Sequence, residues 1–174
     1  MERVRKAARA FAAGLTLLLA AMAIAINLLE TMLTVSLPFG MRLGLANIIA
    51  LITIEILGVK EMIIVNTMRV VIGNLLRGTI FGSTFWISAG GVILSSIVLI
   101  VIKKGLKMSM ISTSMLCAIG HSVGQVVIVM VLYKTAAMMT IVPLLLVTSI
   151  PTGIFTGIVA TQALKRIDKN LVVR

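Results

Sequence analysis

The sequence predicts an all-α integral membrane protein with six transmembrane helices. The chain has 174 residues, of which 60% are hydrophobic and 12% are charged, and its mean hydropathy is +1.18. A soluble domain has about 45–50% apolar and roughly 25% charged residues, so this chain has too few polar residues to cover a surface in water. Its apolar runs are continuous and do not alternate with polar residues, which excludes a transmembrane β-barrel.

Six apolar runs approach the length of about 20 residues that a transmembrane helix needs. They cover residues 8–29, 43–57, 61–80, 85–102, 108–133 and 141–164, within a single domain of residues 1–174. Turn residues separate them, including Pro38, Gly40, Gly58, Gly82 and Gly105. The second run is short, and polar residues interrupt the third.

The first run follows a basic segment, an order that also occurs in secretory signal peptides. The apolar region of a signal peptide has only about 7–15 residues, whereas this run is longer and contains Arg9 in its first turns. We therefore expect an uncleaved first helix. Small residues recur along it at four-residue steps, a spacing that lets helices approach closely: Ala8, Ala12, Thr16 and Ala20.

The connection after the first run, Glu30 to Met41, is long and apolar for an outward-facing loop. One interpretation is a lid that folds back over the outer half of the bundle. The other is an interfacial segment that rests on lipid headgroups. The sequence favours neither.

The second, third and fifth runs carry polar residues at membrane depth, where ionisable groups are costly and usually functional. They are Asn47 and Glu55, then Asn66, Arg69, Asn74 and Arg77, then His121 and Gln125. Spacings of three and eleven residues place Asn66, Arg69 and Arg77 near one helical face. His121 and Gln125 are one turn apart and share a face.

Glycine pairs with the GxxxG spacing of close helix contacts occur in the fifth and sixth runs. They are Gly120 with Gly124 and Gly153 with Gly157.

Most of the 16 Lys and Arg residues flank the runs on the side of the N-terminus. Only Arg42, Arg77 and Lys134 lie toward the opposite side, and Arg69 lies in the middle of a run. Cytoplasmic loops are rich in such cations, so we expect a multi-pass cell-membrane protein with both termini in the cytoplasm. This topology requires an even number of spans. The net charge of +11 thus reflects topology, and we expect no nucleic-acid partner.

We expect the polar residues of the outer half and the middle of the bundle to enclose a pocket that opens outward. The candidate ligand-binding residues are Arg69, His121, Gln125, Asn47, Asn74, Arg42 and Glu30. The pocket's charge is cationic, and arginine binds carboxylate or phosphate groups through paired donors. The alternative is structural: Arg69 pairs with Glu55 or Glu30, and His121 with Gln125, to hold helices together.

Several catalytic classes are excluded. No P-loop motif for ATP occurs. The only aspartate is Asp168, so no Asp-rich magnesium diphosphate site and no Ser-His-Asp triad can form. A single histidine without a carboxylate cluster argues against a metal hydrolase. We expect no catalytic residue, no bound metal and no cofactor.

Glu30 and the run from Leu37 to Asn47 resemble the E…P…G-x-K/R-L-G-L-A-N signature of the Gx transporter family, also known as heptaprenyl diphosphate synthase component I. Arg69, the Ser88-Ala89-Gly90-Gly91…Ser95 stretch and Gly120-His121-Ser122-Val123-Gly124-Gln125 continue the resemblance. The family commonly has His-Asn where this chain has His121-Ser122.

The resemblance implies a relation to the substrate-binding S components of energy-coupling factor (ECF) transporters. These are six-helix bundles with an outward pocket under the first loop. Small residues of their first helix, here Ala8, Ala12, Thr16 and Ala20, dock a coupling subunit, and cytoplasmic ATPases power transport. The ligand would be small, anionic and partly apolar, such as a vitamin or a quinone or isoprenoid precursor.

The synthase name implies a second function. The chain would then be a non-catalytic membrane partner of a soluble prenyl synthase, in prenyl and menaquinone biosynthesis.

Overall fold

The computed structural model describes residues 1–33, 44–106, 108–134 and 136–167. These ranges contain the helices α1 (Glu2–Leu33), α2 (Asn47–Ile56), α3 (Val59–Leu76), α4 (Ser83–Gly105), α5 (Met110–Tyr133) and α6 (Val142–Arg166), with a short 3₁₀ helix η2 (Ala136–Ile141) before α6. No strand occurs in the described ranges, and the predicted all-α class is confirmed there.

Four helices, α1, α4, α5 and α6, are long and apolar enough to cross a membrane. The ten residues of α2 span about 15 Å at 1.5 Å per residue, half of the roughly 30 Å hydrocarbon core. The 18 residues of α3 include Lys60, Glu61 and Arg69. The fold is thus that of a membrane protein with several spanning helices, and the count of six spans stays a prediction.

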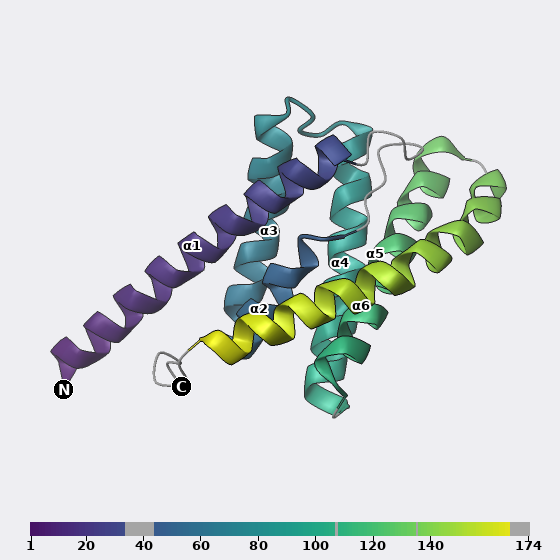
Figure 1. Ribbon diagram of the computed structural model, residues 1–174. Helices are drawn as coiled ribbons and strands as arrows, with labels where there is room; N and C mark the ends of the chain where they lie inside the picture. The colour runs from purple at the N-terminus through teal and green to yellow at the C-terminus, as the bar shows by residue number, and fades with distance from the viewer. Residues whose placement is uncertain (34–43, 107, 135, 168–174) are drawn as a thin grey trace.

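The short helix α2 lies inside the bundle, where it contacts α1, α3, α5 and α6 (Figure 1). Eight of its ten residues are buried, and Ile49, Leu51 and Ile52 join the main apolar core. Lipid cannot satisfy the free backbone groups at the ends of a short helix. Surrounding protein therefore covers α2 and places its N-terminus within the bundle.

Close backbone contacts join α4 to α5 and α5 to α6. A Cβ atom added to Gly90 would lie 2.9 Å from the carbonyl oxygen of Gly124, and one added to Gly153 would lie 2.6 Å from Cα of Met115. A Cβ atom added to Gly157 would lie 2.7 Å from Cα of Ile111. The glycine pairs of the fifth and sixth runs therefore mark close helix contacts, as predicted.

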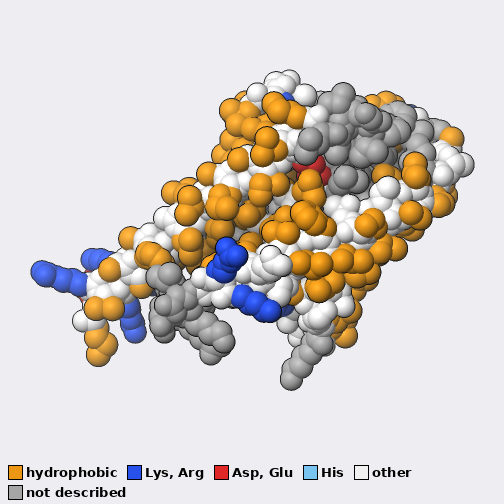
Figure 2. Space-filling view, viewed as in Figure 1, with side chains coloured by type: hydrophobic (Ala, Val, Ile, Leu, Met, Phe, Trp, Pro, Cys, Tyr) orange, Lys and Arg blue, Asp and Glu red, His pale blue; other side chains and the backbone are white. Residues whose placement is uncertain are grey.

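The start of α1 and the end of α6 lie toward the same end of the molecule (Figure 1). Lys and Arg side chains gather toward this end, while hydrophobic side chains cover the flank beyond it (Figure 2). This charge distribution agrees with the cation asymmetry that the topology prediction used.

The first helix is longer than its predicted range of residues 8–29. It begins at Glu2 and continues to Leu33, so Glu30 belongs to the helix and not to the loop. Residues 34–43, which hold most of the predicted lid and Arg42, lie outside the described residues.

Candidate functional site

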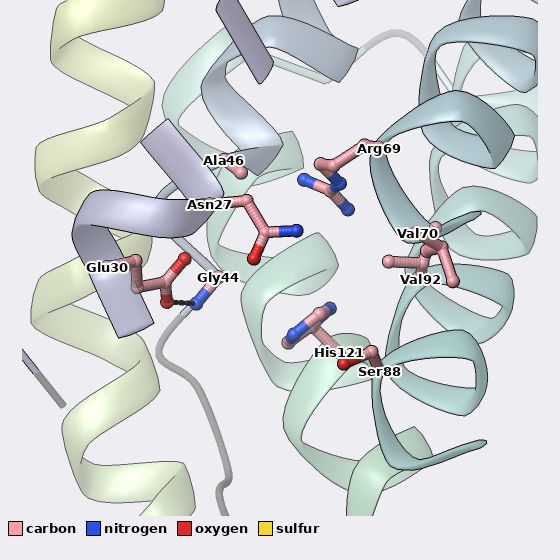
Figure 3. A pocket seen from close by; sticks show the side chains of 9 residues that line it. All are labelled: Asn27, Glu30, Gly44, Ala46, Arg69, Val70, Ser88, Val92 and His121. Atoms are coloured by element: carbon pink, nitrogen blue, oxygen red, sulfur yellow. Dashed lines mark hydrogen bonds between the residues drawn. The ribbon is translucent and has the colours of Figure 1, made fainter. Parts of the chain in front are cut away.

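Residues from four helices (α1, α3, α4 and α5) and the turn before α2 line a buried polar cavity. They are Asn27, Glu30, Gly44, Ala46, Arg69, Val70, Ser88, Val92 and His121. Asn27 of α1, Arg69 of α3 and His121 of α5 are directed toward its centre (Figure 3). The free volume is about 10 Å³, which gives room for about one water molecule. A larger ligand therefore requires these side chains to move apart.

Arg69 is 2% exposed, and its donors are poorly satisfied. Its Nη1 and Nη2 atoms donate to Oδ1 of Asn47 over 3.4 and 3.3 Å, longer than the usual 2.7–3.2 Å. Within the described part of the chain, Nε of Arg69 and Nδ2 of Asn47 have no hydrogen-bond partner. Buried donors without partners are destabilising, so this pair leaves hydrogen-bonding capacity for an acceptor.

The environment of Arg69 decides between its predicted structural partners. Glu55 forms an ion pair with Lys103, joining α2 to α4. The predicted alternative of an Arg69–Glu55 pair is therefore wrong. Glu30 lines the same cavity as Arg69 and attracts its guanidinium electrostatically.

Glu30 also fixes the start of α2, because its carboxylate accepts a hydrogen bond from the backbone N–H of Gly44. Gly44 has a φ of +86°, which side-chain-bearing residues rarely adopt. A Cβ atom at this position would lie 3.0 Å from Nδ2 of Asn47 and 3.3 Å from Cδ2 of His121. Glycine thus lets the chain turn into α2 directly beside the cavity.

His121 and Gln125 lie one turn apart on α5, and their side-chain Nε2 atoms are 2.6 Å apart. This contact joins the amide of Gln125 to the imidazole of His121, and which group donates depends on the imidazole tautomer. Gly91 of α4 makes room for both, since a Cβ there would lie 2.9 Å from each side chain. Gln125 contacts His121 but does not itself line the cavity.

Asn74 and Arg77 belong to a second polar network at the C-terminal end of α3. Arg77 donates to Oδ1 of Asn74 over 2.8 Å and to Oγ1 of Thr31 over 2.7 Å. Thr79 also donates to Oδ1 of Asn74. The network joins α3 to the end of α1, and Asn74 does not line the cavity.

The small residues of α1 divide between the interior and the surface. Ala20 is fully buried in the apolar core and Thr16 is 7% exposed, so both pack within this chain. Ala8 and Ala12 are half-buried and remain reachable from outside. A groove of about 390 Å³ lies between α1 and α3 and is lined by Arg9, Ala12, Ala13, Thr16, Leu17, Lys60, Glu61 and Ile64.

Sequence reasoning missed Asn27 and Ser88 as cavity residues. Asn27 stands three residues before Glu30 in an apolar run, and this spacing on one helical face was a usable signal. Ser88 had no such signal, because serine is common in membrane helices and its hydroxyl bonds the carbonyl of Thr84 within α4.

A protein-family model described as heptaprenyl diphosphate synthase component I matches residues 19–163 of the chain. No curated protein and no solved structure matches it.

Proposed function

Because the chain belongs to the heptaprenyl diphosphate synthase component I family, and because it buries an incompletely paired arginine beside a polar cavity, we propose that it binds a small anionic compound within the membrane. In this proposal it is a substrate-binding subunit similar to the S components of ECF transporters. The observation that carries the proposal is the environment of Arg69, with its long contacts to Asn47 and an Nε that has no partner among the residues that the structure describes.

The donors around the cavity favour an anionic group, although its two charged residues, Arg69 and Glu30, balance in charge. Arg69 and the amide of Asn47 supply donors, and the imidazole of His121 lines the same cavity. A carboxylate or phosphate offers several acceptor oxygens, which a guanidinium binds in pairs. Binding would replace the long Arg69–Asn47 contacts with shorter, charge-assisted ones.

The surface of α1 supports an association with a coupling subunit and its cytoplasmic ATPases. Ala12 lines the groove between α1 and α3, and Arg9 and Lys60 lie at the same groove. Small side chains let a partner helix approach closely. In this proposal the partly exposed small residues of α1, Ala8 and Ala12, contact the partner. Thr16 and Ala20 are buried and hold α1 to its own bundle.

The family description favours a second candidate function. In it the chain is the membrane component of a prenyl diphosphate synthase, and a soluble subunit carries out the chemistry. Of the five acidic residues in the sequence only one is an aspartate, too few for an Asp-rich magnesium site. Neither function makes this chain the catalyst.

Purification from native membranes tests the proposal and separates the two functions. Mass spectrometry of the small molecules retained by the wild-type protein should detect an anionic compound that is lost from the Arg69→Gln variant. A coupling subunit and ATPases should co-purify with the chain. A soluble prenyl synthase in their place, with no Arg69-dependent compound, would contradict the transport function.

A further inference from the structure

A third hollow lies on the exposed apolar flank between α3 and α4. It has a volume of about 200 Å³ and is lined by Thr67, Val70, Val71, Phe85, Ala89 and Ile93. Val71 and Ile93 are 39% and 59% exposed, so the groove is open to the surroundings of the bundle. Its lining is apolar apart from Thr67, and its volume exceeds the roughly 150 Å³ of a dry cavity that binds benzene.

The groove and the polar cavity share a wall. Val70 lines both of them. On α4, Ser88 and Val92 line the cavity, while the next residues, Ala89 and Ile93, line the groove. Val70 and Val92 lie on the side of the cavity away from Glu30 (Figure 3). One layer of side chains thus separates Arg69 from an apolar groove that faces lipid.

The size of the polar cavity restricts what it can hold. With about 10 Å³ free, it has space for part of a charged group once Arg69 and Asn47 rearrange, and for little else. Toward α1 and α2 it is bounded by Asn27, Glu30 and Gly44, the last two tied by a hydrogen bond. The route past Val70 leads to free volume that already exists.

We propose that the ligand is an anionic amphiphile with a single apolar tail, whose head binds Arg69 and whose tail lies in the α3–α4 groove. It enters sideways from the half of the bilayer that surrounds the α3–α4 connection. This inference rests on the proposed binding function of Arg69 and adds the ligand class and the access route. The inference is based on two adjoining spaces of different polarity: the polar cavity at Arg69 suits a charged head, and the apolar α3–α4 groove suits a tail.

The position of the tail is a sharper readout than affinity. Lipid is as apolar as the groove, so moving the tail from lipid into the groove gains little free energy and hardly changes the affinity. A dodecyl phosphate with a photoreactive diazirine at the end of its tail, added to the protein in lipid nanodiscs, reports position directly. Photolysis should label α3 and α4 peptides that contain Val71 or Ala89, and excess dodecyl phosphate should remove the label.

Variants then test both compartments. Ala89→Phe and Thr67→Phe fill the groove from opposite walls. Each should lower the competed label at these peptides by roughly tenfold or more, because the added ring occupies the space of the tail; a tenfold lower occupancy corresponds to about 1.4 kcal/mol. Ala25→Phe makes the same change at an exposed position of α1 and should leave the label unchanged. Arg69→Gln should abolish it.

The outcomes distinguish the inference from the function on which it rests. Competed label in α3 and α4 that depends on Arg69, Ala89 and Thr67 supports the inference. Arg69-dependent label in other helices, or label indifferent to both groove variants, overturns the groove and leaves the binding function intact. Absence of any Arg69-dependent label overturns both.

Discussion

A buried guanidinium destabilises a protein unless its donors find partners. Arg69 has one long-range acceptor in the described residues, Oδ1 of Asn47, at 3.3 and 3.4 Å. A purely structural arginine would have shorter and more numerous bonds. Asn66, one turn away on the same helix, shows such a contact, because its Nδ2 donates to Oγ of Ser96 over 2.8 Å. Among the described residues Oδ1 of Asn66 also lacks a partner, so what sets Arg69 apart is a buried charged group whose only contacts to a side-chain acceptor there are long.

Glu30 should contribute to stability through its hydrogen bond to Gly44. Removing the carboxylate in Glu30→Ala should lower the free energy of unfolding by about 1.5–3 kcal/mol, the range for a charge-assisted hydrogen bond. Glu30→Gln keeps an acceptor oxygen and should lose less. Melting temperatures in one detergent measure both effects, and identical values for the two variants and wild type would contradict this role.

Sequence reasoning identified the charged members of the cavity and missed its smaller polar ones. Arg69, Glu30 and His121 stand out because ionisable residues are rare inside membrane helices. Asn74 was predicted for the same site, yet it bonds Arg77 at the end of α3. Residues on one helix can be assigned to a face from spacing, but their height relative to other helices depends on packing.

At the scale of helices, the glycine contacts predict where added volume is tolerated. In Gly124→Ala the new methyl group would overlap the carbonyl oxygen of Gly90, whereas in Gly14→Ala it meets nothing within 4 Å. Overpacking costs about 1–3 kcal/mol, so Gly124→Ala should lower the melting temperature and Gly14→Ala should not. Equal melting temperatures for the two variants would refute the close α4–α5 contact.

The docking surface on α1 gives a second prediction at this scale. Ala12→Leu should weaken co-purification of the coupling subunit, because a larger side chain holds the partner helix away. Thr16→Leu is less informative, since Thr16 is buried in its own bundle. Ala25→Leu, on an exposed position of the same helix, is the matched control. If Ala12→Leu retains the coupling subunit as well as Ala25→Leu does, α1 does not dock that subunit at Ala12.

The six predicted runs correspond in order to the six α-helices of the described ranges, but the sequence did not predict the position of α2. Its run of apolar residues looked like a short span, and ten helical residues formed, from Asn47 to Ile56. The burial of eight of them could not be deduced, because composition does not distinguish lipid from protein as the apolar neighbour. The extension of α1 to Leu33 was also not predicted, because the segment from Glu30 onward was interpreted as an apolar loop.

For the whole molecule, topology is the first property to test. Both termini should be cytoplasmic, with Lys134 outside and Lys104 inside. In a background where the buried Cys117 is replaced by alanine, a membrane-impermeant maleimide should label Lys134→Cys in intact cells. It should label Lys104→Cys only after the membrane is opened. Labelling of Lys104→Cys but not of Lys134→Cys in intact cells would show the opposite orientation.

The account as a whole depends on Arg69 as the residue that binds an anion. The most direct test is the equilibrium affinity of the compound retained by the wild-type protein, measured together with the melting temperature for Arg69→Gln and Arg69→Lys. A charge-assisted hydrogen bond contributes about 1.5–3 kcal/mol, so Arg69→Gln should weaken binding by about one to two orders of magnitude. Arg69→Lys should restore it only in part, because an ammonium lacks the planar fork. A variant that melts earlier yet binds with unchanged affinity would show that Arg69 is structural and would contradict the account.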